Sequence, residues 1–122
     1  PHDQTRRQRQ MCIRDSCWVL QQPNVNGLAL AARVKDPKSG RMMEVHTNQV
    51  GVQFYGGNFL RPEDFQGEFA SGKGGLAYEY RTALCLETEG FPDAPNQANF
   101  PSTVLCPGET YEHRMLYRFS AE

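Results

Sequence analysis

Glu87 is the residue whose neighbours best suit it to acid–base chemistry. The apolar residues 84–86 lead directly into it, and the residues 90–101 that follow are rich in Pro, Asp and Asn. This order predicts that Glu87 stands at the end of a strand and is followed by a loop through which no helix can continue. A carboxylate held between a core strand and a rigid loop is suited to remove and return a proton as a general base.

The length and the charge of the chain restrict the classes of function that it can have. Its 122 residues are enough for one domain. The 13 Lys and Arg residues are interspersed with 14 Asp and Glu residues, so we expect neither nucleic acid nor a membrane surface as a partner. No apolar run approaches the roughly 20 residues of a membrane span, and no secretory signal is evident, so we expect a cytoplasmic location.

The cysteines show the pattern of neither a metal site nor a disulfide framework. They form no C-x-x-C pair and have no zinc spacing with His2, His46 or His113. We therefore expect free thiols in a reducing compartment and no bound metal. The four cysteines are Cys12, Cys17, Cys85 and Cys106.

Residues 1–16 differ in composition from the rest of the chain. Arg6, Arg7, Arg9 and Arg14 crowd into a polar segment with almost no apolar side chains. This composition is typical of a disordered basic tail. We expect residues 1–16 to be non-native or disordered, and residues 17–122 to form the folded part.

The elements that must position Glu87 are short strands. Turns rich in Gly, Pro, Asn and Asp punctuate the chain, residues 61–75 predict a loop with one helical turn at 62–65, and no amphipathic helix is evident. Short strands with such turns every 8–12 residues predict an all-β fold, a β-sandwich. The expected strands are residues 17–20, 28–35, 41–47, 51–55, 76–86 and 110–119.

Four short motifs follow one another in order along the chain. Residues 34–41 form a strand, an Asp-Pro-x-x-Gly-Arg turn and a second strand, and residues 47–60 contain Gly-x-Gln-x-Tyr-x-x-Asn. Residues 86–96 read Leu-Glu-Thr-Glu-x-x-Pro-Asp-x-x-Asn, and residues 105–111 read Leu-x-Pro-Gly-Glu-x-Tyr. Together these motifs resemble those of the aldose 1-epimerases, from about Cys17 to Ser120.

The sequence departs from that family pattern at two positions within these motifs. Val50 stands where the family usually has proline, and Glu89 stands where it usually has glutamine. The resemblance implies the C-terminal part of a mutarotase-type β-sandwich, of the kind called a supersandwich. It also implies an enzyme that interconverts the α and β anomers of hexoses such as galactose or glucose, with no metal or redox cofactor.

The resemblance also assigns roles to single residues. Glu87 corresponds to the base that removes the proton of the sugar C1 hydroxyl, and Gln53 corresponds to a glutamine that hydrogen-bonds the sugar. Asp15 stands where the family has a sugar-binding Asp. The family's acid is a histidine upstream of these motifs, and neither His46 nor His113 matches a catalytic motif. The chain alone is therefore expected to be inactive.

Other interpretations of the same residues stay open. A non-catalytic carbohydrate-binding sandwich would use aromatic side chains on a flat sheet face, and an epimerase of sugar phosphates would need more arginines than Arg61 and Arg81. Gln53 could be an ordinary strand residue. Asp93 and Asn96 are expected to hold their loop through hydrogen bonds from side chain to backbone. The preferred sugar and the oligomeric state stay open.

Overall fold

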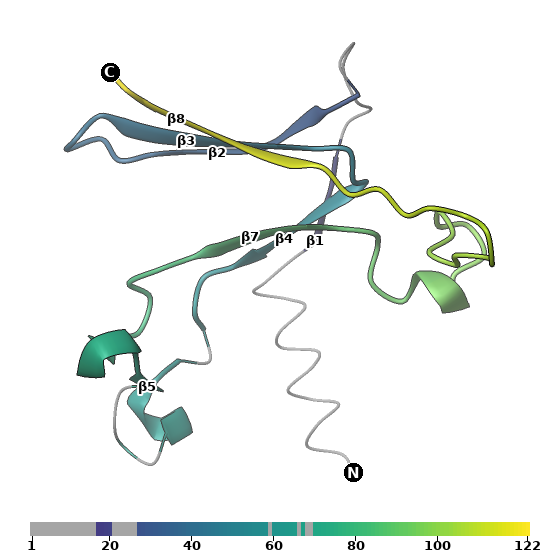
Figure 1. Cartoon of the computed structure of the whole chain (residues 1–122). Coiled ribbons are helices and arrows are strands. Elements are labelled where there is room, and N and C mark those ends of the chain that lie inside the picture. The colour runs from purple at the N-terminus through teal and green to yellow at the C-terminus, as the bar shows by residue number, and fades with distance from the viewer. Residues whose placement is uncertain (1–16, 21–26, 59, 66, 68–69) are drawn as a thin grey trace. The chain divides into compact units, whose positions relative to one another are not determined.

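The structure, a computed structural model, describes residues 17–20, 27–58, 60–65, 67 and 70–122. The chain divides into two compact units, and each is described by itself (Figure 1). Within the described residues, the larger unit comprises residues 17–52 and 86–122, and the smaller comprises residues 53–85. No helix in the described ranges is long and apolar enough to cross a membrane.

An antiparallel sheet in the order β2-β3-β8 forms one part of the larger unit (Figure 1). Its strands are β2 (Ala29–Lys35), β3 (Arg41–Thr47) and β8 (Met115–Ala121). β2 and β3 are joined by a tight turn in which Asp36 accepts hydrogen bonds from the Lys38 amide (3.0 Å) and the Ser39 hydroxyl (2.6 Å). Gly40 completes the turn with a φ of 70°, a conformation that favours glycine.

A second sheet has the strand order β1-β4-β7. Its strands are β1 (Cys17–Val19), β4 (Gly51–Tyr55) and β7 (Cys85–Glu89), of which residues 17–19, 51–52 and 86–89 belong to the larger unit. The Leu20 amide donates to the Val50 carbonyl (2.9 Å), which ties the end of β1 to the start of β4. A 3-10 helix, η3 (Ala94–Asn96), follows β7.

The smaller unit contains short elements only. They are the 3-10 helix η1 (Pro62–Phe65), β5 (Ala70–Ser71), the 3-10 helix η2 (Lys73–Gly75) and β6 (Ala77–Tyr78), and β5 pairs with β6 in antiparallel fashion. The all-β fold class is therefore confirmed. The strands expected at residues 41–47 and 51–55, and the helical turn at 62–65, have the observed bounds.

Two of the expected strands are wrong in their extent. The strand expected at residues 76–86 is broken, because the chain turns between β6 and β7: Arg81 has a φ of 60°, and the Thr82 hydroxyl donates to the Glu79 carbonyl (2.8 Å). The strand expected at residues 110–119 begins only at Met115. Just before Met115, the Arg114 amide donates to the Asn48 side chain (2.9 Å) and not to the backbone of a neighbouring strand.

The buried core of the described residues is small. Val45 and Thr47 of β3 are fully buried, whereas every residue of β8 is exposed. Tyr117 and Phe119 stack on each other at 6.4 Å between ring centroids, with Phe119 73 % exposed. A strand with an apolar surface of this kind is a site for association with another chain.

We expect the 122-residue chain by itself to associate into oligomers or to precipitate. Replacing both Tyr117 and Phe119 by Lys removes the apolar stack and should shift the protein toward a monomer, because charges on an edge strand oppose pairing. Analytical ultracentrifugation measures the change. Val104→Lys, at an exposed loop position outside the sheet, is the control and should leave the association unchanged. A monomeric wild-type chain that unfolds cooperatively would contradict this expectation.

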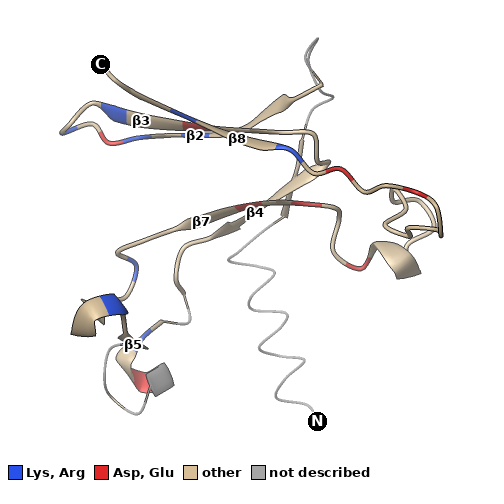
Figure 2. Ribbon diagram, viewed as in Figure 1, with Lys and Arg blue, Asp and Glu red and all other residues tan. Residues whose placement is uncertain are grey.

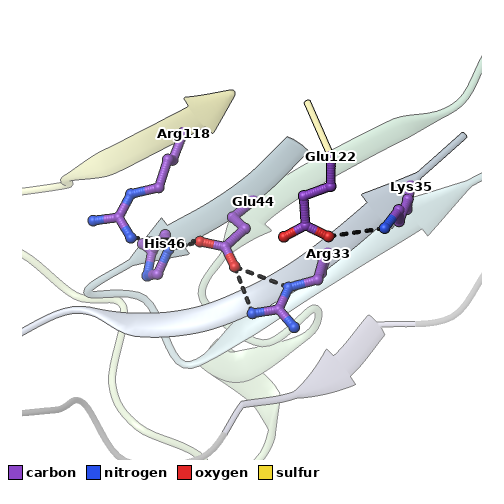
Figure 3. Close-up of polar contacts among 6 residues, drawn as sticks. All are labelled: Arg33, Lys35, Glu44, His46, Arg118 and Glu122. Atoms are coloured by element: carbon purple, nitrogen blue, oxygen red, sulfur yellow. Dashed lines mark hydrogen bonds and ion pairs between the residues drawn. The ribbon is translucent and has the colours of Figure 1, made fainter. Parts of the chain in front are cut away.

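A cluster of charged side chains joins the three strands of the β2-β3-β8 sheet (Figure 3). One Glu44 carboxylate oxygen accepts from Nε (2.8 Å) and Nη2 (2.6 Å) of Arg33. The other lies 3.2 Å from Nε2 of His46 and 3.8 Å from Nη1 of Arg118. The hydrogen bonds of Arg33, and then that of His46, hold the pKa of the Glu44 carboxyl below its ordinary value of 4.5.

This lowered pKa makes stability depend on pH. Glu44 contributes stability that is fully present above pH 4.5 and is lost as the pH falls through the lower pKa of the folded state. The urea midpoint of the wild-type protein should therefore fall between pH 6 and pH 3, roughly the acid range in which paired carboxylates protonate, and fall less in Glu44→Gln. Glu122→Gln, which breaks an exposed ion pair with Lys35, should keep the wild-type dependence. An equal slope for Glu44→Gln and the wild type would contradict this role.

Candidate active site

Glu87 lies in the middle of β7, and its side chain is exposed. Its neighbours alternate as a strand requires, because Thr88 is only 8 % exposed and faces the interior while Glu87 faces outward. β7 carries a second acidic residue, Glu89, two positions further along (Figure 2). Among the described residues, no side chain donates a hydrogen bond to the Glu87 carboxylate, so it is open to a ligand hydroxyl.

Thr88 ties the inner face of β7 to the segment that leads into β8. Its hydroxyl oxygen lies 2.7 Å from Nε2 of His113 and donates to Sδ of Met115 at 3.3 Å. The Tyr111 hydroxyl lies 3.5 Å from Nδ1 of the same imidazole, and the two rings meet edge to face at 6.2 Å. The sequence predicted no role for His113 and a strand over residues 110–119, whereas His113 lies just before β8.

Side-chain contacts hold the loop after β7, although its hydrogen bonds differ from those expected. Asp93 accepts from the side-chain amides of Asn96 (2.6 Å) and Gln97 (2.8 Å), so side chain bonds to side chain rather than to backbone. The bond from Asn96, and then that from Gln97, lowers the pKa of the Asp93 carboxyl. Phe91 packs edge to face on Phe100 at 5.1 Å. These contacts fix the chain that leaves the Glu87 strand.

Glu89 and Cys17, both half-buried, interact with each other, and the sequence did not predict this. Oε1 of Glu89 is buried and has no hydrogen-bond partner among the described residues. Burial, then a hydrogen bond with Glu89 and its charge, raises the pKa of the Cys17 thiol to about 11. Cys17 is therefore protonated at neutral pH and is no nucleophile. In the sequence, the only sign of this interaction was Glu89 itself, which stands where the family usually has glutamine.

The other two predicted site residues are Gln53 and Asp15. Gln53 is half-buried in β4, in the part of that strand that belongs to the smaller unit, whereas Glu87 belongs to the larger unit. Asp15 lies outside the described residues. No group of three or more metal-ligating side chains occurs in the part of the chain that the structure describes. The cysteines of that part, Cys17, Cys85 and Cys106, are free thiols.

Described residues line a pocket in each unit. The larger unit has an open, mostly apolar pocket of about 500 Å³ between Gln49, Gly90, Thr103 and Tyr111, and Glu87 does not line it. In the smaller unit, Arg81 lines a shallow pocket of about 320 Å³.

The arginines of the smaller unit do not open a cradle for a phosphate. Arg81 donates to Oδ1 of Asn58 from Nε at 3.1 Å and from Nη2 at 2.6 Å. The guanidinium groups of Arg61 and Arg81 lie 5.3 and 5.0 Å from the ring centroid of Tyr80. These contacts pair the arginines with protein groups, so the sugar-phosphate alternative gains no support from them.

Comparisons of the amino-acid sequence with known proteins point to one family. The family model described as aldose 1-epimerase matches residues 3–118. The galactose mutarotases of Mus musculus and Homo sapiens are each 48 % identical over 89 residues, which is 73 % of this chain and 24 % of theirs. The aldose 1-epimerase of Escherichia coli strain K12 is 33 % identical over 110 residues, which is 88 % of this chain and 30 % of that protein.

The chain thus spans about a quarter of the length of the curated mutarotases that it matches. The family match begins at residue 3, within the segment that the sequence analysis expects to be non-native, so the boundary at residue 16 stays a prediction. The matched range includes the whole of β7 and the loop that follows it. This chain belongs to the aldose 1-epimerase family.

Proposed function

We propose that the protein containing this chain interconverts the α and β anomers of a hexose such as galactose or glucose, with Glu87 as the general base. The observation that carries the proposal is the exposed Glu87 carboxylate, held in the middle of β7 between a buried Thr88 contact and a rigid loop. The names of the relatives, galactose mutarotase and aldose 1-epimerase, support the reaction class.

The reaction needs only proton transfers. Glu87 takes the proton of the C1 hydroxyl while an acid protonates the ring oxygen, the bond between C1 and the ring oxygen breaks, and an open-chain aldehyde forms. Rotation about the C1–C2 bond presents the other face of the aldehyde to the C5 hydroxyl. The C5 hydroxyl then attacks C1 and returns its proton to the acid, while Glu87 returns its proton to the C1 oxygen. Each acid or base of this kind contributes about 10²–10⁴-fold in rate.

We further propose Gln53 and Asp15 as hydrogen-bond partners of the sugar hydroxyls. An amide offers both a donor and an acceptor, and a carboxylate offers two acceptors, which suits vicinal hydroxyls. We place the catalytic acid in a part of the protein upstream of these 122 residues, in keeping with the resemblance. Residues 17–122 would then be the C-terminal part of a longer sandwich in a cytoplasmic enzyme, inactive as an isolated fragment.

Polarimetry on the complete protein encoded by the gene tests the proposal. Freshly dissolved α-galactose or α-glucose should approach its equilibrium rotation at a rate that rises in proportion to protein concentration. The isolated 122-residue chain is the control and should not accelerate it. Sugar binding by calorimetry without any acceleration would instead support the non-catalytic carbohydrate-binding alternative and would contradict the proposed activity.

A further inference from the structure

We propose that His113 is a positioning residue for Glu87 and that it acts through Thr88. The inference deepens the proposed function and rests on the role of Glu87 as the base. His113 does not touch the exposed carboxylate; it contacts the residue directly behind it. Nothing in the motif that contains Glu87 points to this histidine, because the two partners are 25 residues apart.

The contact between His113 and Thr88 is short and specific. Nε2 of His113 lies 2.7 Å from the Thr88 hydroxyl oxygen, and Thr88 is 8 % exposed. A hydroxyl has one proton, so when Thr88 donates to Sδ of Met115 the imidazole must donate to Thr88 from Nε2. The Tyr111 hydroxyl, 3.5 Å from Nδ1, borders the other side of the ring.

The segment that carries His113 is itself anchored. The buried Thr47 hydroxyl donates to the Arg114 carbonyl at 2.9 Å, and the Arg114 amide donates to the Asn48 side chain at 2.9 Å. A continuous series of contacts therefore runs from the end of β3 through Arg114 and His113 to Thr88. It reaches β7 at the residue next to Glu87.

This anchoring matters because the Glu87 side chain has no fixed partner of its own among the described residues. The direction of its carboxylate is then set by the backbone of β7, and the backbone is fixed from its inner face by Thr88. A base displaced by about 1 Å can lose up to roughly 10²-fold in rate, since proton transfer requires hydrogen-bond distance. Loss of the His113 contact should therefore act on the chemical step rather than on sugar binding.

The test uses paired variants in the complete protein, with polarimetric kcat and KM for galactose. His113→Leu and Thr88→Val remove the contact and should each lower kcat about tenfold with KM changed less than about twofold. His113→Gln and Thr88→Ser keep a hydrogen-bonding group there and should restore most of kcat. The double variant His113→Leu/Thr88→Val should be no slower than either single variant, because both remove the same contact.

Amide hydrogen exchange of β7 gives a readout independent of activity. His113→Leu should speed exchange at residues 86–89 relative to β2, and His113→Gln should not. If His113→Leu does not fold, hydrogen exchange is measured instead in Thr88→Val, whose side chain is nearly isosteric with that of the wild type. If kcat is unchanged in His113→Leu and Thr88→Val while Glu87→Gln is slow, the positioning role is wrong and the proposed function stands. If Glu87→Gln keeps the wild-type rate, Glu87 is not the base and the positioning role is wrong with it; the proposed function itself fails only if the complete protein does not accelerate mutarotation.

Discussion

Replacing Glu87 by Gln in the complete protein is expected to lower the proposed rate of hexose mutarotation by at least about 10²-fold. Gln keeps the size of the side chain and its exposure on β7 but cannot take the proton of the C1 hydroxyl. The side chain is exposed and has no donor among the described residues, so the substitution disturbs no contact seen in this structure. The loss should appear in kcat, measured by polarimetry under saturating sugar.

Glu89→Gln is the matched control for this experiment. It removes a carboxylate from the same strand, two residues away, and introduces the residue that the family usually has there. We expect its rate to stay within about threefold of the wild type, because no role in proton transfer is assigned to it. A Glu87→Gln enzyme as fast as the wild type would remove Glu87 from the mechanism. An equally large loss in both variants would mean that strand charge, rather than the base, sets the rate.

Replacing Thr47 by Val is expected to be the most destabilising conservative change among the described residues of β3. Thr47 is fully buried, its hydroxyl donates to the Arg114 carbonyl (2.9 Å) and it accepts from the Gln49 amide (3.1 Å). Valine has a similar shape but removes both bonds; the Arg114 carbonyl still accepts from the Asn48 amide (3.3 Å), whereas the Gln49 amide loses its bond to the Thr47 hydroxyl. A polar group left unpaired away from water costs about 1–3 kcal/mol, so the free energy of unfolding should fall by an amount in about that range.

Urea denaturation of the purified variants measures this difference. Thr82→Val is the control, since the Thr82 hydroxyl also donates to a backbone carbonyl (2.8 Å) but at an exposed position. Water can replace that bond, so the expected loss is below about 1 kcal/mol. Equal losses at the two positions would show that burial of the Thr47 hydroxyl does not decide its contribution.

The sequence predicted local features better than distant ones. β3 and β4 agree with expectation to the residue, because turn residues delimit them on both sides. The strand expected at residues 76–86 was wrong in extent because Tyr and Thr favour strands, while the turn within it uses a left-handed Arg81 rather than a glycine. Local propensity could not reveal a turn made by a residue that rarely adopts such a conformation.

The same distinction applies to the site. The neighbours of Glu87 in the chain predicted it at the end of a strand that precedes a loop; the strand and the loop are present, but β7 continues through Glu89, so Glu87 lies in the middle of the strand. Its exposure was not expected, because burial depends on which strands pack against it. The contact of Thr88 with His113 joins residues far apart in the sequence, and no spacing rule predicts which distant side chain will meet a strand.

The protonated Cys17 thiol has a practical consequence for labelling chemistry. Maleimides react with thiolates, and a thiol with a pKa of about 11 offers almost none at neutral pH. Cys85 and Cys106 are exposed, so of the described cysteines these two are open to the reagent. Cys85 begins the strand that carries Glu87, so a fluorophore attached there would sit two residues from the proposed base and could report the arrival of a sugar optically.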